Sequence, residues 1–238
     1  MRTRQPALAL RLMCRGRSES RTVVLESVVI ASWTGRDRSA MQRRLAELET
    51  MGIPRPPMLP MFYKIAASRV TTAPRAEVCG DKTSGEVEFV LLQLDGKLWV
   101  GVGSDHTDRA MEARDAGLSK QLCDKPISSD FWCFDDVEPH WDQMRLRSYV
   151  TDDAGHRALY QEGSVAAMLP PRDLLRRWSA LDGVPGPKLL FCGTLSSIGG
   201  IRHAARFDCE LEDPVIARVM TLRYDVTVLP SHLTAPPA

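Results

Sequence analysis

Residues 86 to 109 constrain the fold more than any other stretch, because they predict a β-hairpin whose register is fixed. Two apolar runs flank Asp95-Gly96, and Asp-Gly is a preferred two-residue type I′ turn between antiparallel strands. If Leu94 pairs with Lys97, each residue farther from the turn has one defined partner on the other strand. The turn therefore predicts which side chains meet.

Three carboxylates converge in this register. It places Glu86 opposite Asp105, and Glu88 shares their face because side chains alternate along a strand. Opposed Cβ atoms lie about 5 Å apart and diagonal ones about 7 to 8 Å. The cluster repels itself unless a cation joins it, and hard oxygen ligands suit Mg²⁺, Mn²⁺ or Ca²⁺. The alternative is a solvated acidic face on an edge hairpin.

Further motifs follow in an order that matches a known family. They are Glu86-Val-Glu88, Asp105-x-x-x-Arg109, Lys120, Pro126, and the late stretch Leu189-Leu-Phe-Cys-Gly193-Thr194 to Gly199-Gly200. Over about residues 60 to 230 this order resembles the fumarylacetoacetate hydrolase superfamily, and the whole chain resembles its DUF2848 branch. The resemblance implies a mainly β, α+β fold, a mixed β-roll with a small N-terminal β/α subdomain that acts as lid or dimer contact. It also implies a homodimer.

The resemblance further implies a divalent-metal-dependent enzyme acting on a small molecule. Glu86, Glu88 and Asp105 are expected to hold Mg²⁺ or Mn²⁺, with Ca²⁺ as a further option. A β-dicarbonyl or 2-oxo acid would lose a C–C bond by hydrolysis through a metal-stabilised enolate. The alternatives are a decarboxylase, tautomerase, isomerase or cyclase that uses the same enolate, and a non-catalytic homologue.

Other site residues are expected from the same resemblance. Lys120 matches the family lysine that binds substrate oxygens, and Lys125 is a competing candidate in the same loop. The expected substrate-binding residues are Tyr63, Lys64, Arg109, Gln161, Gly193 and Thr194.

Water activation is where the chain departs from the family. Many family hydrolases carry a His and, three residues later, a Glu on the N-terminal helix. In this chain the position of that His is occupied by Met41 or Arg44, depending on register. Arginine stays protonated and cannot act as a base, which leaves Glu47 as the acid of that pair. No histidine precedes His106. His106 follows Asp105, so we expect it on the opposite face as a structural residue, or as a replacement for the missing base.

Length and composition fit one main domain with a small N-terminal piece. The chain has 238 residues, with 31 basic and 30 acidic side chains and a net charge of +1, which gives no reason to expect nucleic acid or an anionic membrane as partner. No apolar run is long enough to span a bilayer. We expect an N-terminal subdomain over 1–58, a catalytic domain over 59–230 and a tail over 231–238.

Two groups of residues outside the motifs have both a structural and a chemical interpretation. The six cysteines form no CxxC pair, which predicts buried thiols in a reducing cytoplasm, with a nucleophilic Cys123 or Cys192 as the alternative. Asp135, Asp136 and Glu138 are either solvated loop acids or a second metal site.

Hydrophobic periodicity and turn residues predict the remaining elements. They are a strand pair over 7–13 and 22–31, an amphipathic helix over 39–51 ended by Gly52, an extended proline-rich connector over 53–62, a helix over 108–116 ended by Gly117, a strand pair turning at 153–155, a helix from 172, and two strands within 205–230.

Overall fold

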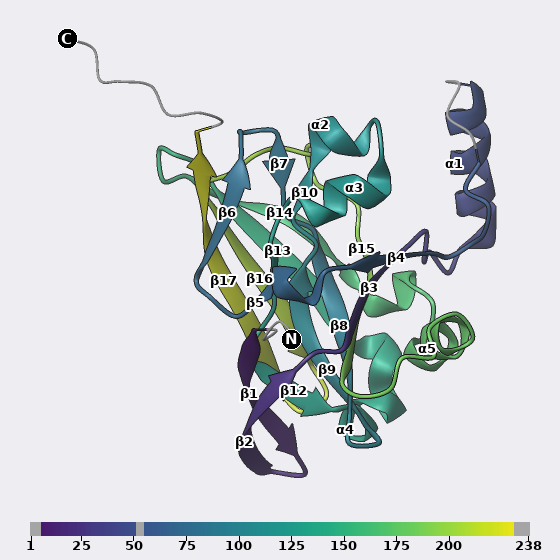
Figure 1. The fold of residues 1–238 in the computed structure, drawn as a ribbon, viewed down its shortest axis with the longest axis vertical. Helices are drawn as coiled ribbons and strands as arrows, with labels where there is room; N and C mark the ends of the chain where they lie inside the picture. Colours follow the sequence, from purple (N-terminus) through teal and green to yellow (C-terminus); the bar gives the residue numbers. More distant parts are fainter. Residues whose placement is uncertain (1–5, 51–54, 231–238) are drawn as a thin grey trace, which may run out of the picture.

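Two packed β-sheets form the body of the protein in the computed structural model, which describes residues 6–50 and 55–230 (Figure 1). The larger sheet runs in spatial order through β2 (Arg17–Val24), β1 (Ala7–Cys14), β12 (Asp130–Cys133), β9 (Lys97–Ser104), β8 (Val87–Leu94), β15 (Lys188–Thr194), β3 (Ser27–Ser32) and β4 (Met61–Ile65). The smaller sheet runs through β14 (Arg157–Ser164), β13 (Arg145–Thr151), β16 (Arg206–Asp213), β17 (Arg218–Leu229) and β6 (Arg75–Cys79).

Short elements complete the chain. Two small ladders pair β10 (Thr107–Asp108) with β7 (Thr83–Ser84) and β11 (Lys125–Pro126) with β5 (Val70–Thr71). The helices are α1 (Arg38–Thr50), α2 (Arg109–Glu112), α3 (Ala116–Gln121), α4 (Phe134–Val137) and α5 (Pro171–Ser179), with 3₁₀ turns η1 (Ala67–Arg69), η2 (Glu138–Gln143) and η3 (Val165–Ala167). None of the helices described is long and apolar enough to cross a bilayer.

Strand β8 is buried on both faces, which explains its unbroken apolar run. Phe89 and Leu91 pack into the core shared with the smaller sheet, while Val90 and Leu92 pack into a second core on the other face of the larger sheet. A strand covered on both sides loses the polar alternation of a half-exposed strand. The catalytic candidates at the end of this strand therefore stand on a rigid support.

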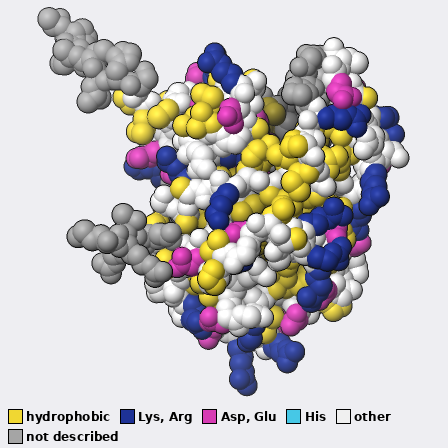
Figure 2. All heavy atoms as spheres, turned by 45° about the vertical axis from the view of Figure 1, so that its right-hand side comes forward, with side chains coloured by type: hydrophobic (Ala, Val, Ile, Leu, Met, Phe, Trp, Pro, Cys, Tyr) yellow, Lys and Arg dark blue, Asp and Glu magenta, His cyan; other side chains and the backbone are white. Residues whose placement is uncertain are grey.

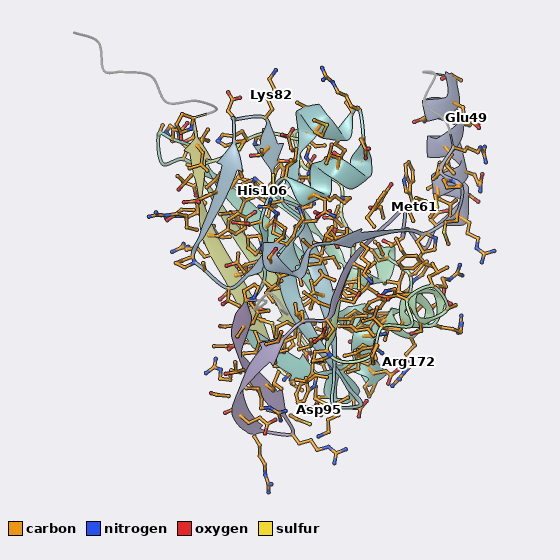
Figure 3. All side chains as sticks on the ribbon, in the orientation of Figure 1. Glu49, Met61, Lys82, Asp95, His106 and Arg172 are labelled. Atoms are coloured by element: carbon orange, nitrogen blue, oxygen red, sulfur yellow. The ribbon has the colours of Figure 1, made fainter. Side chains whose placement is uncertain are left out.

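The predicted hairpin and its register are confirmed. Leu94 pairs with Lys97 across the turn, and Glu88 pairs with Gly103. Asp95 and Gly96 both have positive φ, as a type I′ turn requires. In Figure 3, Asp95 lies in the lower part of the molecule, Lys82 lies near the top, and His106 lies between them.

The mainly β fold with a mixed sheet is confirmed, but a separate N-terminal subdomain is not. β1 pairs in parallel with β12, and β3 pairs in parallel with β15, so strands from the first 58 residues belong to the main sheet. The predicted antiparallel pairing of 7–13 with 22–31 is confirmed only for residues 7–9, which pair with 22–24, whereas residues 27–31 belong to β3 and pair with β15 and β4. β1 pairs with β2 through a tight Arg15-Gly16 turn, and β2 escaped detection because it is a polar, mostly exposed edge strand.

The predicted helices are confirmed except near the site. α1 begins after Asp37, whose carboxylate accepts a hydrogen bond from the Ala40 N–H (2.9 Å), and the predicted Gly52 stop lies outside the described residues. The single helix over 108–116 is wrong. Asp115 caps a new helix, α3, by accepting from the Leu118 N–H, so Gly117 lies inside a helix instead of ending one.

Candidate functional site

Three carboxylates form the centre of the candidate site. Glu86 lies just before β8, Glu88 lies in that strand, and Asp105 directly follows β9. One carboxylate oxygen from each lies within 4.8 Å of the others. Glu88 is 2% exposed and Asp105 is fully buried. The hairpin register therefore brings together the cluster that the sequence predicted.

Three cations surround this cluster. Lys120, from α3, contacts one oxygen of Asp105, and the Nζ of Lys125 lies 3.2 Å from the other. Arg109 holds Glu86 at 2.9 Å. Both lysines thus contact Asp105, and of the two only Lys120 lines the cavity described below.

The pKa shifts show an uneven balance of charge. Burial, with the charges of Asp105 and Glu86, raises the pKa of Glu88 well above its ordinary value. Burial acts to raise the pKa of Asp105, but Lys120 and Lys125 hold it below its usual range. Burial acts to lower the pKa of Lys120, but its acidic neighbours hold it above its ordinary value. Lys120 therefore stays charged, and Glu88 is the carboxylate that lacks a cation.

Gly193 fixes the position of Glu88. Its N–H donates a hydrogen bond to the Oε2 of Glu88 at 2.7 Å. Its φ is +95°, and an added Cβ would lie 1.9 Å from the Oγ1 of Thr34. A residue with a Cβ would be strained at this φ and would clash with Thr34. Glycine is therefore required at the position whose N–H binds the Glu88 carboxylate.

Gln161 ties the strands around the cluster together. Its Oε1 accepts from the Val87 N–H (2.9 Å) and the Ser148 hydroxyl (3.1 Å). Its Nε2 donates to the hydroxyl of Thr194 (2.8 Å) and to the Leu195 carbonyl (2.6 Å). The Thr194 hydroxyl in turn donates to the Val87 carbonyl at 2.7 Å. These groups already have protein partners, so they position the site.

A cavity of about 990 Å³ opens onto the cluster. Of the residues predicted to form the site, Tyr63, Glu86, Glu88, Lys120, Gln161, Gly193 and Thr194 line it. Asp105 lies behind Lys120 and is fully buried. Figure 2 shows the side of the molecule that carries α1, and hydrophobic side chains gather on it. The cavity reaches this helix at Leu45.

Besides Asp105, four predicted residues do not line this cavity, and the local geometry explains each. Lys64 follows Tyr63 in β4, so alternation turns it away, and its Nζ lies 3.4 Å from Asp182. Glu47 is exposed on α1, whereas Leu45 of that helix lines the cavity. Arg109 lies behind Glu86 as its ion-pair partner.

His106, the fourth, lies on the opposite face from Asp105, as a structural histidine should. It is fully buried, and its two ring nitrogens lie 3.0 Å from the hydroxyls of Tyr224 and Thr83. Burial, with the charges of Lys125 and Arg109, lowers its pKa to about 3. His106 therefore stays neutral and faces away from the cavity, which does not support a role as the missing base.

Glu112 is a functional candidate that the sequence reasoning missed. It ends α2, lines the cavity, and accepts a hydrogen bond from the Nη1 of Arg109 at 2.7 Å. The Arg109-x-x-Glu112 spacing, which places both side chains on one helical face, was the available signal. The helix expected over 108–116 contained this pair, but no role in the site was assigned to Glu112.

The alternative chemical groups are not supported as sites. Cys123 and Cys192 are buried, and burial raises the pKa of the Cys123 thiol to about 11, which disfavours the nucleophilic thiolate. Asp135, Asp136 and Glu138 do not form a group of potential ligands among the described residues, and Glu138 pairs with Arg172. Cys14, Cys133 and Asp136 do converge, but burial and Cys14 raise the pKa of Cys133 to about 11.

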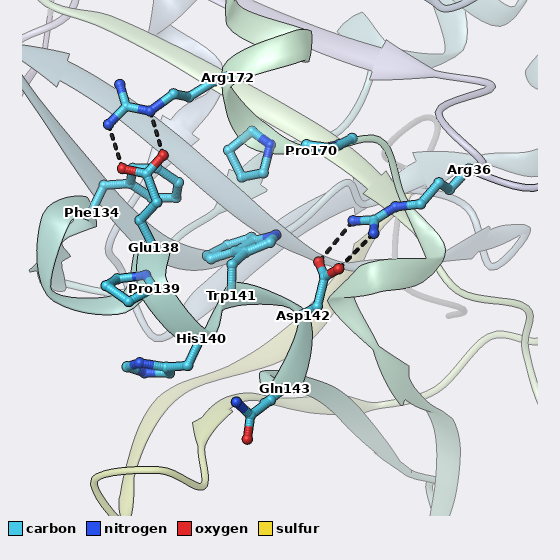
Figure 4. A pocket seen from close by; sticks show the side chains of 11 residues that line it. Arg36, Phe134, Glu138, Pro139, His140, Trp141, Asp142, Gln143, Pro170 and Arg172 are labelled. Carbon is cyan, nitrogen blue, oxygen red and sulfur yellow. Dashed lines mark hydrogen bonds and ion pairs between the residues drawn. The ribbon is translucent and has the colours of Figure 1, made fainter.

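A second cavity, of about 400 Å³, lies beside α5 and η2 (Figure 4). Its charged residues neutralise one another, because Arg36 binds both oxygens of Asp142 (2.8 and 2.9 Å) and Arg172 pairs with Glu138. It holds no group of potential metal ligands among the described residues. The carboxylate cluster and its larger cavity are the stronger candidate.

Comparison with known proteins identifies a family and a fold. Residues 31–224 match the model of a family described as a protein of unknown function, DUF2848. A solved structure described as Cg1458 is 16% identical, with a TM-score of 0.61, and the match covers 90% of this chain and 83% of that chain. A 2-keto-3-deoxy-D-arabinonate dehydratase complexed with magnesium and 2,5-dioxopentanoate is 15% identical, with a TM-score of 0.58 and coverage of 89% and 77%. No curated protein matches the sequence. The structural likeness shows the fold alone, and it agrees with the expected fumarylacetoacetate-hydrolase-like fold.

Proposed function

The chain belongs to the DUF2848 family, and from the geometry of its site we propose that it is a divalent-metal-dependent enzyme that hydrolyses a C–C bond in a 2-oxo acid or β-dicarbonyl small molecule. The observation that carries this proposal is the convergence of Glu86, Glu88 and Asp105, beside Lys120, on a cavity large enough for a substrate. Sites with a few polar groups converging in a well-formed cavity are the usual places for small-molecule chemistry.

The cluster fits a hard divalent cation. Each of the three carboxylates offers one oxygen within 4.8 Å of the others, and burial, followed by the charges of Asp105 and Glu86, raises the pKa of Glu88, an effect that a bound cation would offset. Mg²⁺ or Mn²⁺ is our choice of ion, and Ca²⁺ is a third option. Bound there, the ion would polarise two substrate oxygens and stabilise the negative charge of an enolate.

Lys120 supplies the main electrostatic contribution from the protein. Asp105 holds its ammonium group beside the cluster, and its raised pKa keeps the charge in place. It would donate a hydrogen bond to the substrate oxygen that becomes negative as the C–C bond breaks. Gly193 and Thr194, expected to bind a substrate carboxylate, act in this proposal by fixing Glu88 and the β8–β15 contact.

Glu112 is the proton acceptor in the proposed reaction. Among the described residues that line the cavity it is the carboxylate outside the metal cluster, and no histidine lines the cavity. A proton would pass from water to Glu112 as the water oxygen bonds to the acyl carbonyl carbon. The C–C bond then breaks, its electron pair enters the enolate, and the enolate carbon takes a proton back. The products are a carboxylic acid and a shorter 2-oxo acid.

A non-hydrolytic reaction of the same enolate is the second candidate. It is favoured by the lack of a histidine among the described cavity residues, because the resembling hydrolases use a His–Glu pair to activate water. None of these reactions needs an attacking water: isomerisation moves a proton between carbons, decarboxylation releases CO₂ and returns a proton to the enolate carbon, elimination of water removes a proton at carbon and releases the hydroxyl as water, and cyclisation joins the enolate carbon to another carbon of the substrate. Elimination of water is the activity that the name of one structural neighbour states for that protein.

Proton NMR of an acylpyruvate with the purified protein and Mg²⁺ separates these candidates. Hydrolysis yields pyruvate and the free carboxylic acid, and EDTA or Glu88→Gln should abolish it. Exchange of the C3 protons with D₂O that is faster than in a protein-free control containing Mg²⁺, without cleavage, would replace hydrolysis by a non-hydrolytic enolate reaction. No cleavage and no exchange beyond that control, with no metal-dependent binding, would favour a non-catalytic homologue.

A homodimer and a cytoplasmic location stay predictions. The six cysteines are free in the structure, which supports a reducing compartment. Sedimentation velocity on the purified protein tests the dimer, and a monomer at micromolar concentration would contradict it.

A further inference from the structure

The cavity is much larger than the group that the carboxylate cluster would hold. It extends from Glu88 and Gly193 to Leu45 of α1, with a volume of about 990 Å³. A three-carbon 2-oxo acid needs on the order of 100 Å³, on the scale of about 30 Å³ for one water. Most of the cavity is therefore available to the rest of the substrate.

Apolar and aromatic side chains line the part of the cavity formed by the N-terminal segments and the β15–β16 loop. They are Trp33, Leu45, Pro56, Pro57, Met61, Leu195 and Ile201. Surfaces of this kind bind apolar groups, because burial removes both partners from water. Polar side chains of Thr194, Ser196 and Ser197 lie on the wall that β15 and its following loop contribute.

Trp33 is held in an unusual backbone conformation at this wall. Its φ is +60°, a region that bulky residues rarely adopt. The neighbouring backbone is anchored, since the Thr34 carbonyl accepts a hydrogen bond from the Leu169 N–H at 2.7 Å. Such conformations persist where the surroundings impose them, and they concentrate at ligand sites. The indole is thus placed at the cavity by the fold.

The cations that line the cavity, among the residues described, are already paired. Lys120 contacts Asp105 beside the cluster. Arg55, near α1, lies 2.8 Å from the Oε1 of Glu49 and 3.1 Å from the Oε1 of Gln42. A second carboxylate at the far end of a substrate would therefore be desolvated without a free cationic partner.

We propose that the substrate carries a large, uncharged, mainly apolar acyl substituent, such as a branched alkyl or aryl group, which packs against the apolar lining of the cavity, including Trp33, Met61 and Ile201. This inference rests on the proposed function, because it assigns the substituent attached to the chelating 2-oxo acid or β-dicarbonyl group. It excludes dicarboxylates with a distal charge as preferred substrates.

Three pyruvates acylated at C3 test size and charge separately. Acetylpyruvate is small, 4-methylpentanoylpyruvate adds four carbons, and succinylpyruvate has nearly the shape of the latter but ends in a carboxylate. Each buried methylene is worth about fourfold in kcat/KM, so four give up to about 250-fold if all are buried. We expect kcat/KM for 4-methylpentanoylpyruvate to exceed the values for both other compounds by at least tenfold.

An exposed pair of isoleucines provides the variant and its control. Ile201, 58% exposed, lines the cavity, whereas Ile216, 52% exposed, lies in the β16–β17 turn outside it. Ile201→Asp should lower the ratio of kcat/KM for 4-methylpentanoylpyruvate over acetylpyruvate at least fivefold. Ile216→Asp should leave that ratio within twofold of the wild-type value, because it adds the same charge away from the cavity.

Binding measurements separate this inference from the proposed reaction. Equal kcat/KM for the three compounds, or a preference for succinylpyruvate, would overturn the substrate class while hydrolysis stands. If no compound is cleaved, calorimetric titration of each in the presence of Mg²⁺ decides. Tighter binding of 4-methylpentanoylpyruvate would support the substrate class without the hydrolytic function, and equal or undetectable binding would overturn it.

Discussion

Gly193→Ala gives the sharpest test of how the fold holds the carboxylate cluster. The new Cβ would lie 1.9 Å from the Oγ1 of Thr34, in a backbone with φ of +95°. Positive φ costs a residue with a Cβ roughly 1–2 kcal/mol. Forcing an atom into a packed region typically costs about 1–3 kcal/mol. We therefore expect the free energy of unfolding to fall by about 2–5 kcal/mol.

Two further substitutions separate the strain from the clash. Gly155 has φ of +87° and nothing within 4 Å of an added Cβ, so Gly155→Ala should show the backbone strain alone, about 1–2 kcal/mol. Thr34→Ala removes the clashing hydroxyl. The Cβ of residue 34 remains 3.1 Å from the added Cβ, so in that background Gly193→Ala should cost only slightly more than Gly155→Ala, which a double-mutant cycle measures as a coupling of about 1 kcal/mol or more.

Urea denaturation and thermal unfolding followed by circular dichroism measure these differences. For a chain of this size each kcal/mol corresponds to about 2–4 °C in Tm, so Gly193→Ala should lower Tm by about 4–20 °C. The close approach between β15 and Thr34 would be refuted if Gly193→Ala were no less stable than Gly155→Ala. It would also be refuted if Thr34→Ala did not reduce the loss of stability caused by Gly193→Ala. Either result would also remove the reason for glycine beside Glu88.

The remaining predictions concern the metal and the chemistry. Lys120→Met should lower kcat by about 10² to 10³ with an unchanged circular dichroism spectrum, and a loss below tenfold would contradict its electrostatic role. Mg²⁺ at 100 times its Kd should stabilise the protein by about 2.7 kcal/mol, raising Tm by about 5–11 °C. Glu88→Gln should abolish this shift, and Glu19→Gln, on the exposed strand β2, should retain it; a shift that persists in Glu88→Gln would place the metal elsewhere. Glu112→Gln should lower kcat by about 10² to 10⁴ and leave the Mg²⁺-dependent Tm shift intact. Loss of both would assign Glu112 to metal binding or structure.

Local geometry made the centre of the site predictable. The Asp95-Gly96 turn fixes strand pairing over eight residues on either side, and alternation then decides which carboxylates share a face. Glu86, Glu88 and Asp105 converge for these reasons. The same local rule accounts for Tyr63 facing the cavity while Lys64 turns away. Alternation alone says that Tyr63 and Lys64 point to opposite faces of β4. Which face borders the cavity depends on the strands that pack beside β4.

Other parts of the fold lacked a local signal. β2 is polar and exposed, so its pairing with β1 carries no hydrophobic pattern. α2 and α3 are separated because Asp115 caps the second of them, and a periodic pattern alone reads them as one helix. The N-terminal strands join the main sheet through parallel pairing with β12 and β15, which are far away in the chain.

The sequence alone determines the hairpin, its register and the three carboxylates at its open end, because each depends on contacts between residues close along the chain. The tertiary structure decided the rest: Lys120 and Lys125 both on Asp105, Gly193 against Thr34, Glu112 beside the cavity and His106 buried behind it. Alternation along the strand predicted the opposite face for His106, but not its contacts with Tyr224 and Thr83. The other arrangements depend on how the sheets and helices pack, which no periodicity or turn signal encodes.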